Sequence, residues 1–86
     1  MELNFERMEI FTGVSKRECV VTDAREVFAD LIYNHGNGVR AHALAMKIFQ
    51  GEGAVDYTDE EVEVVKRYAE MCTPAFIDAI YKQMGL

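Results

Sequence analysis

Apolar residues recur with helical spacing in four separate stretches of the chain, and each stretch predicts one helix. The third is the clearest: in "YTDEEVEVVKRYAEMC" the apolar positions 62, 65, 69 and 72 form one stripe. Thr58 and Glu61 occupy the two positions of a capping box, which predicts that this helix begins at residue 58. The four predicted helices cover residues 23–34, 39–50, 58–72 and 74–84.

The fourth and first helices carry similar boundary signals. In "TPAFIDAIYKQMGL", Thr73 is the expected cap, Pro74 takes the first helical position and Gly85 ends the helix. In "TDAREVFADLIYN", Thr22 or Asp23 is the expected cap, and apolar residues follow at 24, 27, 28, 31 and 32. Almost no loop separates the third and fourth helices, so we expect them to meet at a sharp corner.

The second predicted helix is apolar on nearly every side. Its apolar residues fall on two faces, one with Val39, Ala43, Met46 and Phe49 and the other with Leu44 and Ile48. A helix of this kind lies at the centre of a domain or at an interface. We therefore expect the other helices to surround it, and the candidate interface residues are Val39, Leu44 and Ile48.

Residues 1–21 show no helical stripe and predict a β-hairpin. "MEIFTG" and "RECVVT" are rich in residues that favour strands, and a glycine lies in the short segment between them. An isolated two-stranded hairpin is marginally stable in water, so it must pack on the helices or pair with another strand. The expected fold class is α+β, mainly α: one domain, 1–86, with a hairpin region, 1–21, followed by a compact four-helix bundle, 22–86.

The net charge of −6 narrows the range of partners. Residues 51–86 hold eight Asp or Glu against three Lys or Arg, and this acidic half predicts a solvated face. No cluster of Lys and Arg exists, so we expect no nucleic-acid partner. We expect no membrane partner either, because no apolar run approaches the roughly 20 residues that span a bilayer. Without a recognisable signal peptide, the sequence predicts a cytoplasmic protein whose Cys19 and Cys72 are reduced and buried.

The stretch "HGNGVR", residues 35–40, is the one candidate for a ligand site. A glycine turn before a helix exposes N–H groups that attract anions, and the candidate residues are His35, Gly36, Gly38 and Arg40. The stretch lacks the lysine of a phosphate-binding loop and the third glycine of a dinucleotide fingerprint. A glycine after a helix normally ends that helix. The sequence therefore favours a plain turn, and an anion- or nucleotide-binding module is the alternative.

No metal centre, cofactor or catalytic constellation is predicted. His35 and His42 are separated by two glycines that break the helix, and neither has a cysteine or carboxylate at a supporting spacing. Cys72 lies on the apolar stripe of its helix, and nothing places Cys19 beside a histidine. We therefore expect a protein that is not an enzyme.

From residue 43 onward, the chain resembles small proteins of phages, prophages and other bacterial mobile elements. The shared pattern is an "ALA-K-I-Y/F" segment, an acidic linker, a "T/S-x-E-E-V/I" helix start, then a tyrosine and a proline. The matching residues are Ala43, Leu44, Ala45, Lys47, Ile48, Phe49, Thr58, Glu60, Glu61, Val62, Tyr68 and Pro74. This resemblance implies a small helper or structural protein and carries over no enzymatic site.

The expected function is that of a non-enzymatic, small acidic interaction or assembly protein, encoded by a phage or mobile element, with an unidentified protein partner. Self-association is also expected, because the second helix and the hairpin edges both leave surface that a lone domain covers poorly. A symmetric dimer would bury the outer face of that helix or join hairpins across a two-fold axis. The alternative is that the hairpin folds over the second helix within one chain.

Overall fold

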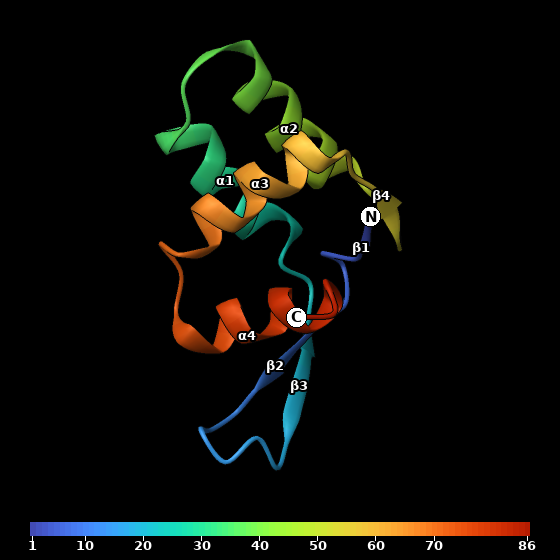
Figure 1. Ribbon diagram of the computed structural model, residues 1–86, viewed down its shortest axis with the longest axis vertical. Coiled ribbons are helices and arrows are strands. Elements are labelled where there is room, and N and C mark those ends of the chain that lie inside the picture. Colours follow the sequence, from blue (N-terminus) through green and yellow to red (C-terminus); the bar gives the residue numbers. More distant parts are fainter.

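The structure, a computed structural model, describes residues 1–86 and contains four helices and four short strands (Figure 1). In chain order these are β1 (Glu2–Leu3), β2 (Met8–Phe11), β3 (Cys19–Thr22), α1 (Arg25–His35), α2 (Gly38–Gln50), β4 (Val55–Asp56), α3 (Asp59–Ala69) and α4 (Pro74–Gln83). The strands form two separate pairs, β1 with β4 and β2 with β3. The predicted class, α+β and mainly helical, is confirmed. None of the helices has the length and apolar character needed to cross a membrane.

The predicted hairpin is present and consists of β2 and β3. The antiparallel register runs from Met8 opposite Thr22 to Phe11 opposite Cys19. Lys16 reverses the chain between the strands with a φ of 58°, in the left-handed region. The strand-forming residues on both sides of this turn therefore pair as the sequence indicates.

The hairpin packs against α4 and extends away from the other helices (Figure 1). Nζ of Lys82 on α4 lies 2.7 Å from Oε2 of Glu9, and Nζ of Lys16 lies 3.7 Å from Oδ2 of Asp78. Met8, at the base of the hairpin, is 1% exposed and belongs to the core. The hairpin does not cover α2, so the alternative in which it folds over the second helix is wrong.

The pairing of β1 with β4 was not expected from the sequence, because strands of two residues are too short to show a periodic pattern. In this pair Leu3 lies opposite Val55. A second contact joins the same N-terminal segment to α4. The Asn4 N–H donates to Oε1 of Gln83 at 2.7 Å, and Nε2 of Gln83 donates to the Asn4 carbonyl at 3.0 Å. The first residues of the chain are thereby held against both the middle and the end of the helical region.

The core is organised around α1. Phe28 is 1% exposed and lies between Phe5 and Phe76, with its ring centroid 5.2 Å and 5.4 Å from theirs. Ile32, one turn later on the same face of α1, is fully buried. Phe28 on α1 therefore connects the N-terminal segment to α4 through two aromatic contacts.

The prediction that α2 is the centre of the helices is wrong. α2 packs along α1 at the end of the molecule opposite the hairpin (Figure 1). Its buried residues are Leu44, Ala45 and Ile48, and its exposed large apolar residues are Val39, Met46 and Phe49. The alanines make this helix apolar on every side, but their small side chains bury little surface and require little cover. The other three helices therefore do not surround α2.

The predicted caps of α3 and α4 are confirmed. The Glu61 N–H donates to the hydroxyl oxygen of Thr58 at 3.2 Å, and the Thr58 N–H donates to the Glu61 carboxylate at 2.8 Å. This reciprocal pair is a capping box. Thr73 caps α4, with Pro74 in the first turn where no N–H is needed. Local side-chain chemistry thus sets where both helices begin.

Two helix boundaries differ from the predictions by two residues or more, and the burial of one cysteine also differs. α1 begins at Arg25 rather than at residue 23, and the Asp23 carboxylate accepts from the Arg25 N–H at 3.1 Å from outside the helix. α3 ends at Ala69 rather than at residue 72, and the chain then turns directly into α4.

Cys72 in this turn is half-buried, and burial raises the pKa of its thiol. Cys19 on β3 is exposed, so the prediction of two buried thiols is wrong for this residue.

Candidate functional site

Both glycines of the 35–40 turn have structural roles. The Gly36 N–H donates to the Ile32 carbonyl at 2.7 Å and closes α1. A Cβ on Gly36 would lie 2.6 Å from that carbonyl oxygen and 2.7 Å from the Cβ of Ala41, so a larger residue would force the surrounding backbone to shift. Gly38 begins α2 with a φ of 84°, a conformation that favours glycine. The end of α1 therefore accounts for Gly36, and the start of α2 accounts for Gly38.

His35 and Arg40, the two candidate side chains for anion binding, line different surfaces. The Arg40 side chain is 94% exposed, and its Nη1 lies 3.6 Å from Oε2 of Glu60. The depression beside Arg40 is also lined by Arg67 and by the carboxylates of Glu60, Glu61 and Glu63. The negative groups outnumber the positive ones there, which disfavours an anion. His35 lines a different groove, next to α1. The structure does not bring these two side chains together around the turn.

The two histidines are not parts of a metal site in this fold. No three side chains of His, Cys, Asp or Glu lie close enough together to hold a metal ion. The ring of His42 instead packs near the ring of Tyr33, with 5.8 Å between their centroids. This contact links α2 to α1 on the exposed side of the helix pair.

A cluster of the buried Tyr57 with the half-buried Lys47 and Glu61 joins α2 to α3. Nζ of Lys47 donates to Oε1 of Glu61 at 2.9 Å and lies 4.7 Å from the centroid of the Tyr57 ring. Partial burial alone would raise the pKa of Glu61, but hydrogen bonds from Lys47 and from the backbone of Thr58 outweigh it and lower that pKa. Burial, with the nearby Glu61 charge, raises the pKa of Tyr57 to about 12. Both shifts move the pKa values of these two groups further from neutrality.

Two apolar grooves flank α1, and the larger has a volume of about 410 Å³. It lies between α1 and the turn that joins α3 to α4. Val27 and Leu31 line it from α1, and Met71 lines it from the turn. The side chains at its mouth are open to solvent, since Val27 is 74% exposed and Met71 is 54% exposed. Apolar residues on both walls can therefore contact another molecule.

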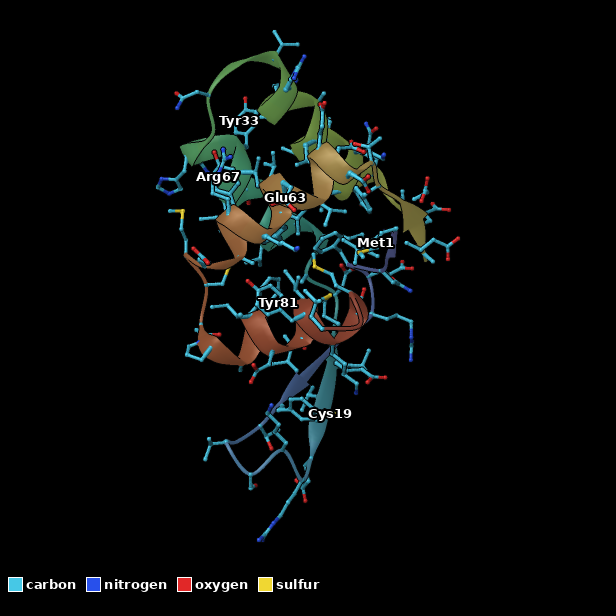
Figure 2. All side chains as sticks on the ribbon, in the orientation of Figure 1. Met1, Cys19, Tyr33, Glu63, Arg67 and Tyr81 are labelled. Carbon is cyan, nitrogen blue, oxygen red and sulfur yellow. The ribbon has the colours of Figure 1, made fainter.

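The second groove has a volume of about 340 Å³ and lies between α1 and α2. Tyr33 lines it from α1, and Met46 and Phe49 line it from α2. Tyr33 is 60% exposed and Phe49 is 49% exposed. Figure 2 shows Tyr33 near the end of the molecule that is opposite the hairpin. The two grooves thus place exposed apolar side chains on both sides of α1.

Two carboxylates accompany these apolar side chains. Asp30 lines both grooves, and Glu26 lines the groove between α1 and α2. Neither forms an ion pair within the chain. We call this surface the α1 face, and its members are Glu26, Val27, Asp30, Leu31, Tyr33, Met46, Phe49 and Met71.

The interface residues predicted from the sequence lie mostly elsewhere. Leu44 is 3% exposed and Ile48 is 0% exposed, so both belong to the core of the chain. Val39 is 84% exposed at the start of α2, outside both grooves. The sequence analysis put Val27 on the apolar stripe of the first helix and did not single out Tyr33. The α1 face could have been recognised from the sequence, because the first helix carries more apolar residues than one buried stripe can hold.

Comparison with known proteins gives no match: no family model, no curated protein and no solved structure is significantly similar to this chain. The candidate site therefore stands on the geometry of the chain alone.

Proposed function

We propose that this chain is a non-enzymatic, small acidic interaction or assembly protein that acts in the cytoplasm through protein–protein contacts. The observation that carries the proposal is the α1 face, where exposed apolar side chains line two adjacent grooves. Single exposed apolar residues are common on protein surfaces and need no explanation. Exposed apolar residues that gather around one element are typical of binding surfaces.

The charges on the α1 face favour a particular kind of partner. Glu26 and Asp30 stand beside the apolar side chains without a basic residue of this chain paired to them. The whole chain carries a net charge of −6. A basic amphipathic helix of another protein would place apolar side chains in the grooves and Lys or Arg near these carboxylates. The charges would then contribute mainly to specificity and to the rate of association.

The resemblance of the C-terminal half to phage and mobile-element proteins supports a partner of phage or host origin. Phe49 belongs both to the resembling pattern and to the α1 face. Met71 also comes from the resembling half of the chain. The proposed role in assembly rests on this resemblance together with the exposed surface.

The test compares two lysine substitutions at exposed valines. Val27→Lys places a positive charge at the mouth of the larger groove, while Val14→Lys makes the same change at the tip of the hairpin connection. Val14 is 101% exposed, so the control substitution disturbs no packing. Each tagged protein is used to capture partners from cells that naturally produce the chain, after circular dichroism confirms equal folding.

The proposal predicts that one protein is captured by the wild type and by Val14→Lys and is lost with Val27→Lys. Its capture should weaken as salt rises, because screening reduces the attraction between carboxylates and a basic partner. Equal capture by all three proteins would mean that the α1 face is not the binding surface.

A further inference from the structure

The outer edge of β3 is a second unpartnered feature, at the opposite end of the molecule from α2 (Figure 1). All four residues of this strand are exposed, including Val20 at 56% and Val21 at 46%. The strand contains no charged residue and no proline. Figure 2 shows Cys19 on the part of the hairpin that extends beyond α4. No other segment of the chain covers this edge.

The hydrogen-bond pattern shows which backbone groups of β3 are free. The Thr12 N–H donates to the Glu18 carbonyl at 3.0 Å, and bonded pairs alternate along an antiparallel ladder. Val20 therefore bonds to its opposite residue on β2, while Cys19 and Val21 direct their N–H and C=O groups away from β2. Outside the ladder, neither residue has a backbone partner elsewhere in the chain.

Free edges of this kind are usually protected in natural proteins. Lysine, proline, a bulge or a covering segment normally prevents an edge strand from pairing with another chain. β3 has none of these within Cys19–Thr22, and three of its four residues are β-branched. An extended, uncharged, β-branched edge favours the addition of a further strand.

We propose that β3 pairs antiparallel with β3 of a second copy of this chain, with Val20 opposite Val20 across a two-fold axis. In this register the outward groups of Cys19 meet those of Val21 in the other copy, which forms four backbone hydrogen bonds. The result is a four-stranded sheet in the order β2-β3-β3-β2. This surface is separate from the α1 face, so the pairing is independent of the proposed function.

Packing supports this register. Val20 lies opposite Ile10 within the hairpin, and Ile10 is half-buried against the core. Two closely spaced valines at the axis would therefore continue a row of four β-branched side chains across the sheet. Cross-strand contacts between side chains of this size stabilise a sheet relative to alanine pairs. The row would cover the exposed part of Val20.

The charged residues that flank β3 also favour this register over the two adjacent registers. Arg17 before the strand comes opposite Asp23 after it, at both ends of the pair, and both residues are exposed. Asp23 also binds Arg25 of its own chain at 2.7 Å, and a carboxylate can accept from two guanidinium groups. Placing Val21 opposite itself would put Asp23 opposite Cys19, which carries no positive charge. Placing Cys19 opposite itself would leave Asp23 without a basic residue opposite.

Cysteine cross-linking tests the register directly. In a Cys19→Ser background, Val20→Cys places two thiols on opposite residues about 4.5 Å apart between Cα atoms, within the range of a disulfide. Thr22→Cys in the same background is the matched control on the same edge. Its two thiols would be offset by four residues, or roughly 13 Å along the strands. The Cys19→Ser protein without a further substitution shows whether Cys72 forms a cross-link.

Mild oxidation should convert Val20→Cys to a covalent dimer and leave the other two proteins monomeric on a non-reducing gel. Equal cross-linking of Val20→Cys and Thr22→Cys would overturn the register. No cross-linking of Val20→Cys would overturn the pairing itself.

A second variant keeps the proposal testable without cysteines. Val21→Pro removes an outward N–H that no group of the same chain uses, and edge strands tolerate proline at such positions. Sedimentation equilibrium should show the wild type approaching twice its mass of 9.8 kDa as concentration rises. Val21→Pro should weaken the dimer roughly ten-fold or more, because two hydrogen bonds are lost per dimer. A wild type that stays at 9.8 kDa from micromolar to millimolar concentration contradicts the proposal.

Discussion

Truncation of Phe28 to alanine should be among the most destabilising single changes in this chain. The side chain is 1% exposed, and its ring packs against Phe5 at 5.2 Å and Phe76 at 5.4 Å. Phe→Ala changes in cores cost about 3–5 kcal/mol. The upper part of that range is expected because two aromatic contacts disappear together. A chain of 86 residues has a total stability of roughly 4–13 kcal/mol, so the loss is a large share of it.

The matched control is Val27→Ala, because Val27 is the preceding residue on α1 and is 74% exposed. A surface change of this kind should alter the free energy of unfolding by no more than about 0.5 kcal/mol. Urea unfolding followed by circular dichroism measures both, at one fixed protein concentration so that any self-association contributes equally. The placement of Phe28 at the centre of the core is refuted if its truncation costs less than about 1 kcal/mol, or if Val27→Ala costs as much.

Three further predictions follow from local contacts. Gly36→Ala should lower the stability by about 1–3 kcal/mol in thermal unfolding, because its Cβ would lie 2.6 Å from a backbone oxygen, whereas Gly13→Ala meets nothing within 4 Å and should be neutral. The pKa of Glu61 is lowered in the folded state, so its stabilising contribution is present above the ordinary pKa of a glutamate and is lost as pH falls through the lowered value. In Glu61→Gln the free energy of unfolding should therefore fall less steeply as pH is lowered. The same pH dependence in the variant and the wild type would contradict this assignment. The pKa of Tyr57 is raised to about 12, so ultraviolet titration should show one phenolate that forms near pH 12 and is absent in Tyr57→Phe.

Features set by local chemistry could be predicted from the sequence. The capping box of Thr58 and Glu61 and the Thr73–Pro74 start depend on residues at most three positions apart, and both are present. The hairpin was also predictable, because strand-forming residues flank a short turn. Each of these features is decided within a few neighbouring residues, where side-chain chemistry acts directly on the backbone.

Features that depend on distant contacts could not be predicted. The Leu3–Val55 pairing joins strands of two residues whose partners are far apart along the chain, so no periodic pattern reveals it. The apolar pattern of α2 suggested a central helix, but Phe49 on this helix is exposed. Likewise Val27 fits the apolar stripe of α1 and still faces solvent. Periodicity shows which residues share a face, and only the packing of the other elements decides which faces are covered.

Site-specific photo-cross-linking tests the proposed binding of a protein partner at the α1 face. A benzophenone amino acid is placed at Val27 in the larger groove, or at Val14 in the hairpin connection as the control. Both proteins are irradiated in cells that naturally produce the chain. If the partner binds at the α1 face, position 27 should give a discrete adduct with one other protein and position 14 should give none. No adduct from position 27, or the same adducts from both positions, would contradict it.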